Sequence, residues 1–514
     1  MAFPIILALA GAWLTYMVFL VVYRLHFSPI AKFPGPKLAA LTFWFEGYYD
    51  VFLGGKYLWK IKELHEQYGP IVRINPSELH IADPDFWDIM YTASTSTNRR
   101  EKWDWHAKAV GLLTSTLTSS GHALHRSRRG ALAPFFSMAN VRKLLPTVQE
   151  RVNSLVERLE MCGKQGEMIR LEYAFSAFTN DVVMQYSFGR SDHHIEASGF
   201  DPLFHNTSFD AAKSINLLRH CNWILSIMLA LPESLAVRMG EEVSSQIRLR
   251  SERIRQIEDI REGDSIKKGE DGSDKTIFHT LLRSDLPKRE KENERLAEEA
   301  VLLVGAGTHT SSWCLSVVTF HLLSNPPLLK RLKTELKSAI RDPTNLSLPD
   351  LEKLPYLTAV LKEGLRLGYG VTVRSARIAP DTALKCGDWV IPPGTPCSCT
   401  IPLTHHDENI FPDSHAFKPE RWLGEGAHGL DKYLVSFSKG SRACLGINLA
   451  WAEMYLATAG IFSHFGSKEA QEKTDVGVLE LYETDISDVA LVSDMFFPVA
   501  KEGSKGVRVK VSAK

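Results

Sequence analysis

A single cysteine stands in a frame of residues that restricts what this chain can fold into. The segment Phe437–Gly446 reads F-S-K-G-S-R-A-C-L-G and contains Cys444. Within it Gly440 permits a tight turn with positive φ, and Gly446 lets the backbone come close to a flat ligand. This frame favours a thiolate that ligates haem iron over a buried, inert cysteine. The fold must therefore enclose a macrocycle beside Cys444.

The same spacing resembles the haem-ligand signature of the cytochrome P450 family. The resemblance implies a mainly α fold with small β-sheets, and haem b, which is iron protoporphyrin IX, as the cofactor. It implies that Cys444 is the metal ligand, because a thiolate pushes electron density onto bound oxygen. Arg442 is placed to pair with a haem propionate, and Phe437 to shield the sulfur from water.

Two further segments fit the same family. Leu361–Leu367 reads L-K-E-G-L-R-L, and on a helix Glu363 and Arg366 share one face, where they can pair. Phe417–Trp422 reads F-K-P-E-R-W and offers Arg421 as a third member. In the family such a cluster locks the segment before the cysteine loop, which implies a structural role. An ordinary helical ion pair is the alternative.

An apolar run over Val301–Phe320 predicts a central helix with an unusual middle. Gly305 and Gly307 each cost about 1 kcal/mol in a helix interior. The hydroxyl residues after them can bond to preceding carbonyls and bend the helix. A kinked core helix would show the same features. In the family, Ala306, Gly307 and Thr310 match an oxygen-binding groove, which implies that Thr310 relays protons.

One position departs from the family pattern. The residue before the threonine is normally Asp or Glu, whereas this chain has His309. A histidine with its ordinary pKa of about 6.5 can shuttle protons near neutrality, and Ser311 or Thr308 can order water beside it. The substitution keeps open a haem-thiolate isomerase or peroxygenase that needs no reductase. A third alternative, a non-enzymatic haem sensor, is disfavoured by Thr310.

Further propionate contacts are expected on two arginines. Gly121–Ser137 carries basic residues ahead of an apolar stretch, and Arg129 is the best-placed of them, with His125 where many relatives have a tryptophan. A solvated basic helix face is the alternative. Arg377, in V-R-S-A-R-I, resembles another propionate contact, although Arg374 competes for that role.

The walls of a substrate pocket are predicted from helical spacing and family position. Two residues of the central helix share the face of Thr310, and a short loop follows the Glu363 helix. The segment Trp103–Leu113 occupies the region over the distal haem face. Each position has the alternative of an ordinary core role. An apolar pocket beside a membrane implies a lipophilic substrate. The candidate residues are Leu303, Ala306, Val371, Thr372 and Val373.

The start of the chain predicts a membrane anchor. Residues 3–23 carry no charge, and a helix of that length spans about 30 Å of hydrocarbon. No basic residue precedes the run, which argues against a cleaved secretory signal. We expect a single-pass protein of the endoplasmic reticulum membrane with a cytosolic catalytic domain, because basic residues follow the run. These are Arg24, His26, Lys32 and Lys37.

We therefore expect three parts. Residues 1–23 form the transmembrane anchor, residues 24–45 a proline-containing hinge, and residues 46–514 one haem-thiolate catalytic domain. A single domain follows because the matched segments, from Arg129 to Cys444, must meet in one fold. The chain has 60 basic and 60 acidic residues, which argues against nucleic acid as a partner. Its seven cysteines lack paired C-x-x-C spacing, which favours reduced thiols facing the cytosol.

Between these landmarks the sequence predicts mostly helix with a few strands. The expected helices are Leu58–Tyr68, Val141–Met161, Ala300–Leu323 and Pro327–Ile340. The expected strands are Ile71–Ile74, Leu79–Ala82, Asp388–Ile391 and Val507–Val511. Glu258–Lys275 is rich in charge, Gly and Ser, and we expect it to be an exposed loop.

Four segments point to a subgroup within the family. They are F-P-G-P-K-L-A-A-L, Y-Y-D-V, G-A-G-T-H-T-S-S-W and L-Y-E-T-D-I-S-D-V, and they resemble fungal secondary-metabolism cytochromes that include trichodiene oxygenase. The resemblance implies oxygenation of a terpenoid, with polyketides and alkaloids as open alternatives. It implies O2 and NADPH as co-substrates, with electrons delivered by a membrane-bound NADPH-cytochrome P450 reductase. The products would be a hydroxylated or epoxidised compound and water.

Overall fold

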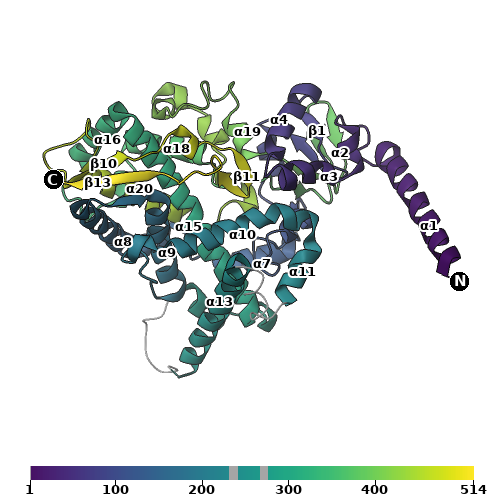
Figure 1. Cartoon of the computed structure of the whole chain (residues 1–514), viewed down its shortest axis with the longest axis horizontal. Helices are drawn as coiled ribbons and strands as arrows, with labels where there is room; N and C mark the ends of the chain where they lie inside the picture. The colour runs from purple at the N-terminus through teal and green to yellow at the C-terminus, as the bar shows by residue number, and fades with distance from the viewer. Residues whose placement is uncertain (1, 96, 231–240, 267–275) are drawn as a thin grey trace.

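The protein is a helical body with small sheets and one helix that projects from it (Figure 1). The computed structural model describes residues 2–95, 97–230, 241–266 and 276–514. The projecting helix is α1, Ala2–Val22. The helices of the body are α2 Lys37–Leu41, α3 Trp44–Gly47, α4 Tyr57–Tyr68, α5 Phe86–Met90, α6 Asp104–Lys108, α7 His122–Leu132, α8 Met138–Gln165, α9 Leu171–Phe188, α10 Pro202–His220, α11 Asn222–Ala230, α13 Glu241–Ile266, α14 Ile277–Arg283, α15 Asn293–Ser324, α16 Pro326–Ala339, α17 Leu348–Leu351, α18 Pro355–Gly368, α19 Ile401–His405 and α20 Ile447–His464.

The strands form two small sheets and two hairpins. The first sheet has the order β1-β2-β8-β5-β3, with β1 Ile71–Arg73, β2 Leu79–Ile81, β8 Pro396–Ser398, β5 Arg377–Ile378 and β3 Glu101–Lys102. The second has the order β4-β13-β10-β9, with β4 Met168–Arg170, β13 Arg508–Ala513, β10 Gly477–Leu481 and β9 Phe465–Gly466. The hairpins pair β6 Leu384–Cys386 with β7 Trp389–Ile391, and β11 Ser493–Met495 with β12 Phe497–Val499.

α15 is the central helix because it is apolar on most of its surface and other helices cover it on several sides. It packs against α9, α13, α18 and α20. At Gly307 a Cβ would lie 2.8 Å from Val183 Cγ2, so the glycine is what lets α9 approach this closely. The middle of α15 is thereby fixed in the core, where it can carry a site.

The predicted helices and strands are found, with bounds that differ by a few residues. The helices are α4, α8, α15 and α16, and the strands are β1, β2, β7 and β13. One prediction is wrong, because residues 258–266 form the end of α13 and not a loop. Ile257 and Ile260 are buried there, so the charged segment has an apolar face at helical spacing. The rest of that predicted loop, residues 267–275, lies outside the described residues.

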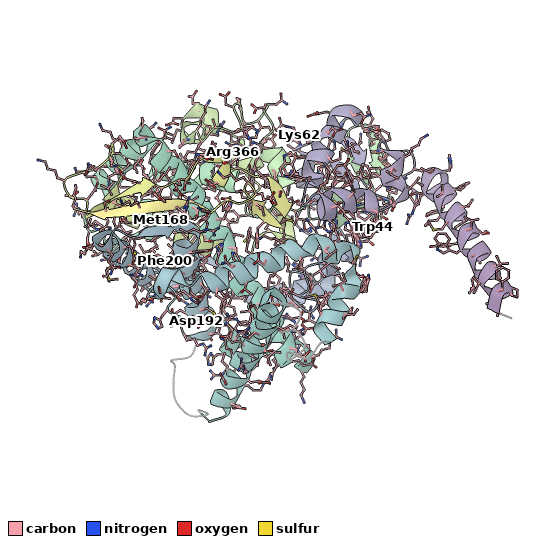
Figure 2. The ribbon with its side chains drawn as sticks, viewed as in Figure 1. Trp44, Lys62, Met168, Asp192, Phe200 and Arg366 are labelled. Atoms are coloured by element: carbon pink, nitrogen blue, oxygen red, sulfur yellow. The ribbon has the colours of Figure 1, made fainter. Side chains whose placement is uncertain are left out.

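α1 carries the apolar surface that the sequence predicts for an anchor. The segment Phe3–Phe27 has a mean hydropathy of 2.4 and none of it is buried. α15 is also long and apolar enough to cross a membrane, but 56% of its most apolar stretch is buried, as in a core helix. The segment after α1 packs onto the body, since Ile30 and Phe33 are buried. Trp44 lies on the surface on the same side of the molecule (Figure 2).

Candidate functional site

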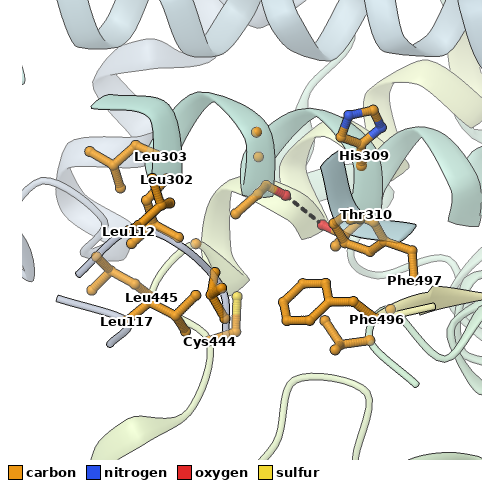
Figure 3. Close-up of a pocket in the computed structure, with 18 of the residues that line it drawn as sticks. Leu112, Leu117, Leu302, Leu303, His309, Thr310, Cys444, Leu445, Phe496 and Phe497 are labelled. Carbon is orange, nitrogen blue, oxygen red and sulfur yellow. Dashed lines mark hydrogen bonds between the residues drawn. The ribbon is translucent and has the colours of Figure 1, made fainter. Parts of the chain in front are cut away.

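A cavity of about 580 Å³ lies between α15 and the loop that carries Cys444. Figure 3 shows Thr310 on α15 along one wall, with Cys444 and Leu445 facing it across the space. The thiol has accessible surface although it is desolvated by the protein around it. Its accessible surface therefore belongs to this internal cavity.

The cysteine loop is held by its backbone. The Cys444 N–H donates to the Phe437 carbonyl over 2.8 Å, which closes the loop. Gly440 has φ +70°, and a Cβ there would lie 2.2 Å from the Thr92 carbonyl oxygen, so the turn requires glycine. No atom lies within 4 Å of the position a Cβ would take at Gly446, which leaves open space beside the thiol.

The surroundings of Cys444 act on its sulfur in two directions. Burial raises the pKa of the thiol, whereas the Gly446 N–H and the Arg129 guanidinium favour the thiolate. A bound cation would displace the remaining proton, as metal ligation by cysteine requires.

Basic side chains from several elements line the cavity near the cysteine loop. We call them the cationic rim, and its lysine and arginines donate to carbonyl or hydroxyl oxygens. Arg129 donates to the Ala443 carbonyl over 2.8 Å, and Arg442 to those of Ser119 and Ser120, each over 2.6 Å. Within the part of the chain that is described, no carboxylate lies within ion-pair distance of any rim residue. The rim consists of Lys102, His125, Arg129, Arg377 and Arg442.

The rim residues repel one another. Lys102 on β3 is paired in register with Arg377 on β5, and like charges opposite each other destabilise a sheet. Burial, and then Arg377, lower the pKa of Arg442 to about 9. Burial, and then Arg442 and Arg129, lower the pKa of His125 to about 2. A ligand with two carboxylates would relieve this repulsion, and haem with its two propionates is such a ligand.

The sequence left Arg374 open as an alternative to Arg377 for the propionate contact. The structure excludes Arg374 from the cationic rim. Its Nη2 contacts Glu46, and its Nε lies 3.3 Å from Glu78 Oε2. Arg219 of α10 lies 3.1 Å from Glu46 and 3.4 Å from Asp50. These five buried residues form what we call the acid network, which joins the amino-terminal part of the body to α10. Arg374 is neutralised by these acids and Arg377 is not.

Thr310 has the orientation that a role at the cavity requires. Its hydroxyl donates to the Ala306 carbonyl over 2.9 Å, so its oxygen remains free to accept a further hydrogen bond (Figure 3). Thr308 instead faces the core, where its hydroxyl donates to Val304 over 2.7 Å. α15 continues through this region as an α-helix.

His309 does not have the pKa of a histidine that holds a proton near neutrality. Burial lowers its pKa to about 4, so the charged form is disfavoured at neutral pH. Its ring lines a part of the cavity away from Cys444 (Figure 3), where it contacts Phe204 and Phe497. The interpretation based on the ordinary histidine pKa is therefore wrong. At neutral pH the imidazole ring of His309 is therefore uncharged.

A buried acid near Thr310 was missed. Glu453 of α20 lines the cavity, and burial raises its pKa to about 8, opposed by a hydrogen bond from Ser311. Its Oε1 has no other partner among the described atoms. The signal in the sequence was an acid inside the apolar helix that directly follows the cysteine loop.

Four of the five residues predicted for the pocket wall line the cavity. Leu303, Ala306, Val371 and Val373 line the cavity, whereas Thr372 does not. The Thr372 hydroxyl donates to Asp494 Oδ1 over 2.8 Å, which turns it toward the β11–β12 hairpin. Leu112, from the predicted segment Trp103–Leu113, also lines the cavity. Side chains that the sequence did not indicate complete the wall, among them Leu117, Phe204, Ile215, Phe496 and Phe497.

The loop that carries Leu112 and Leu117 is tied to α15 by two adjacent acids. Glu298 accepts hydrogen bonds from the N–H and hydroxyl of Thr114, each over 2.6 Å. Glu299 accepts the same pair from Thr116, over 3.0 and 2.9 Å. We call this arrangement the glutamate clamp. It sets how far the loop reaches into the cavity.

The predicted Glu363, Arg366 and Arg421 side chains lie together. Arg366 donates to both Glu363 oxygens, over 2.9 and 2.8 Å, and Arg421 donates to Glu363 Oε1 over 3.0 Å. Trp422 and the Lys418 N–H complete the shell of the carboxylate. Arg366 and Glu363 are fully buried, and Arg366 lies inside the body (Figure 2). The cluster is remote from the cavity and has a structural position.

The cytochrome P450 family model matches residues 36–481 of the chain. The chain belongs to the cytochrome P450 family. Several fungal P450s resemble it over nearly its whole length. Cytochrome P450 monooxygenase tpcC of Cochliobolus heterostrophus is 46% identical over 504 residues, which covers 97% of this chain and 95% of that protein. Cytochrome P450 monooxygenase astB of Talaromyces wortmannii is 43% identical over 510 residues, which covers 97% and 96%.

Two other similar proteins extend this picture. Tryptophan 6-hydroxylase fscE of Fusarium equiseti is 41% identical over 502 residues, which covers 96% of this chain and 94% of that protein. Retinoic acid-bound cyanobacterial CYP120A1 shares the P450 fold, with a TM-score of 0.66 at 21% identity over 88% of this chain and 94% of that chain. The predicted fold is confirmed.

The chain is thus a haem-thiolate monooxygenase, similar to P450 monooxygenases of fungal secondary metabolism. The P450 family uses haem iron, and the residues of this cavity fit that group. A thiol faces open space, a turn that only glycine allows holds the loop, and the cationic rim has no carboxylate within ion-pair distance among the described residues.

Proposed function

We propose that the protein is a membrane-anchored P450 that inserts oxygen from O2 into a lipophilic secondary metabolite, with a terpenoid as the first substrate class. Electrons come from NADPH through NADPH-cytochrome P450 reductase. The observation that carries the proposal is the cavity itself. Cys444 and Thr310 face each other across it, and the cationic rim surrounds the cysteine side.

On the cysteine side, each residue has a task toward the cofactor. Haem, when bound, supplies an iron centre that activates dioxygen for transfer to substrate. Cys444 ligates the iron, and Phe437 shields the sulfur from water. Arg129, Arg377 and Arg442 pair with the propionates, together with Lys102 and His125 of the rim. Gly440 and Gly446 keep the loop narrow and the space beside the thiol open.

On the other side, the chain positions the substrate and moves protons. The Thr310 hydroxyl donates to the Ala306 carbonyl, so its oxygen can accept a hydrogen bond from a proton donor at the cavity face of α15. Leu303, Val371 and Val373 exclude water and orient an apolar molecule by shape. The pocket offers this molecule little hydrogen bonding, which suits a hydrocarbon skeleton.

A terpenoid is proposed because the wall near Thr310 is aliphatic and aromatic. Polyketides and alkaloids are alternatives with comparable apolar skeletons. The similar enzyme fscE is named for hydroxylation of tryptophan, so an indole substrate belongs in the same test. A screen should therefore include one member of each class.

The membrane proposal rests on α1 and on the surface near it. Trp44, Phe52 and Trp223 are exposed by 50%, 71% and 61%. Aromatic side chains favour the membrane–water interface. Together with the basic residues after α1, they support a single-pass protein in the endoplasmic reticulum membrane with the body on the cytosolic side.

The carbon monoxide difference spectrum of the dithionite-reduced protein tests the proposed ligand. We expect a strongly red-shifted Soret band in the full chain and its loss in Cys444→Ser. Absence of the band in folded protein supplied with haem would refute the proposal.

Turnover with reductase then separates the reaction classes. Product that requires NADPH supports the monooxygenase on that substrate. Product formed without NADPH from an isomerisable or peroxide-containing mixture would point to an isomerase or peroxygenase instead.

A further inference from the structure

We propose that His205 and His309 together form the route by which solvent protons reach Thr310. The inference rests on the proposed function and adds His205, a residue of α10, to the proton-delivery machinery. On α15 this chain has His309 at the position before Thr310 and not an acid. Because the buried His309 ring is uncharged at neutral pH, it needs a partner that can pass a proton to it and take up another.

The two rings lie against each other in the interior. Their centroids are 5.1 Å apart with an interplanar angle of 62°. His309 is 5% exposed and His205 is 8% exposed. The Nε2 of His309 is buried and has no hydrogen-bond partner among the described residues, although an unpaired buried ring nitrogen is costly. A proton can pass between the unpaired nitrogen and the second imidazole through a bridging water.

His205 is fixed by a chain of hydroxyls that returns to α15. Its Nδ1 lies 2.8 Å from Ser176 Oγ on α9. Ser176 donates to Ser312 Oγ over 3.3 Å, and Ser312 donates to the His309 carbonyl over 3.1 Å. These contacts fix the ring of His205 with one nitrogen engaged and leave the other for a proton. These contacts also connect His205 to the turn of α15 that carries His309.

The route continues in both directions from the pair. Outward, Tyr173 packs edge-on against the His205 ring and its hydroxyl donates to the exposed Asn206, so His205 lies next to the surface, and a proton reaches its ring from solvent water. Inward, His309 and Thr310 line the same cavity, so water in the cavity can join the ring to the threonine hydroxyl. The pair thus bridges the α9–α10 surface and the face of α15 that carries Thr310.

The chemistry uses imidazole as a two-sided group. A neutral ring accepts a proton on one nitrogen and releases another from the second nitrogen, so no charge remains after the transfer. Monooxygenation consumes protons, since substrate, O2, NADPH and one H⁺ give oxygenated substrate, H2O and NADP⁺. NADPH supplies the two electrons for this reaction. Both hydrogens of the water enter the site as protons from solvent. Burial keeps either ring from retaining a proton.

The test compares His205→Phe and His309→Phe with Phe209→Leu as the matched control. Phe209 stacks on His205 at 6.0 Å and carries no nitrogen. Each full-length variant is reconstituted with reductase, with farnesol as the terpenoid probe. The readouts are hydrogen peroxide released per NADPH oxidised, product per NADPH, and the solvent isotope effect in D2O.

We expect both histidine variants to lose product per NADPH by roughly tenfold, with a matching rise in peroxide and a larger solvent isotope effect. Phe209→Leu should behave as the wild type. His309→Asp, which restores an acid at that position, should recover coupling. Turnover driven by added hydrogen peroxide should be unchanged in all variants, because peroxide brings its own protons.

Three outcomes separate the explanations. Unchanged coupling in His205→Phe, with a normal carbon monoxide band, would overturn this inference alone. An equal loss in peroxide-driven turnover would show that the rings only shape the cavity, and would also overturn it. Loss of the carbon monoxide band in the wild type would overturn the proposed function and this inference with it.

Discussion

At the scale of single residues, Glu453 has the environment that most changes a side chain's charge. Its pKa of about 8 in the fold, against an ordinary value of 4.5, means that the folded state holds its proton where the unfolded chain has lost it. The stabilising contribution of this proton is complete below about pH 4.5 and is lost as the pH rises to about 8.

Glu453→Gln should therefore gain stability relative to the wild type as the pH rises. We expect similar thermal midpoints at pH 5 and an advantage of the order of a few kcal/mol for the variant at pH 9. Thermal unfolding of the haem-loaded proteins across this pH range measures the difference. A constant difference at all pH values would show that the carboxyl keeps an ordinary pKa.

The sequence revealed residues that stand in a family motif or beside their partners in the chain. Cys444 and Gly440 stand in one loop, so their pattern could be read directly. Lys102 could not be found, because it enters the rim only through its pairing with Arg377 on a different strand. The pKa of His309 could not be predicted for the same reason, since the burial that lowers it comes from α10 and the β11–β12 hairpin.

At the scale of elements, the glutamate clamp should restrict the motion of the loop over the cavity. The amides of Thr114 and Thr116 donate to Glu298 and Glu299, so these amides should exchange slowly. Glu298→Ala should speed hydrogen exchange in the peptide that covers residues 112–118. Glu294→Ala is the matched control, because the Glu294 side chain is 79% exposed. Equal exchange in both variants would contradict the clamp.

A second element-scale prediction concerns the Glu363 cluster. Glu363→Gln leaves the buried Arg366 without its charge partner, and breaking such a pair costs about 3–5 kcal/mol. The exposed pair of Arg331 and Glu420 gives a control, since Glu420→Gln should cost less than about 1 kcal/mol. Urea unfolding of both variants measures the two costs. A loss below 1 kcal/mol for Glu363→Gln would mean that the cluster is not a structural lock.

Elements were predictable where their period was regular. The four predicted helices have apolar residues at spacings of three and four, and tertiary packing only moved their ends. α13 was missed over residues 258–266 because its charged face dominates the composition, while its apolar face has few residues. Thr372 was assigned to the pocket because loop position alone cannot show that Asp494 turns its side chain away.

At the scale of the whole molecule, we predict that α1 is separable from the rest of the protein. It is exposed along its length and contributes no cavity-lining residue. A chain without residues 2–23 should keep the red-shifted carbon monoxide band while losing most of its binding to lipid vesicles. Co-sedimentation with vesicles and the difference spectrum measure the two properties on one sample. Unchanged vesicle binding would show that the aromatic surface near Trp44 suffices for attachment.

The acid network also sets an order of events during synthesis. Glu78 is made long before Arg374, from which it is separated by 296 positions. At about 5–20 residues per second, that interval lasts roughly 15–60 s. During this wait Glu78 has no arginine partner in the acid network and Glu46 has only Arg219, so the region that is translated first cannot be completed first. A nascent chain that stops short of Arg374 would leave Glu78 without its arginine and its leading segment open to proteolysis.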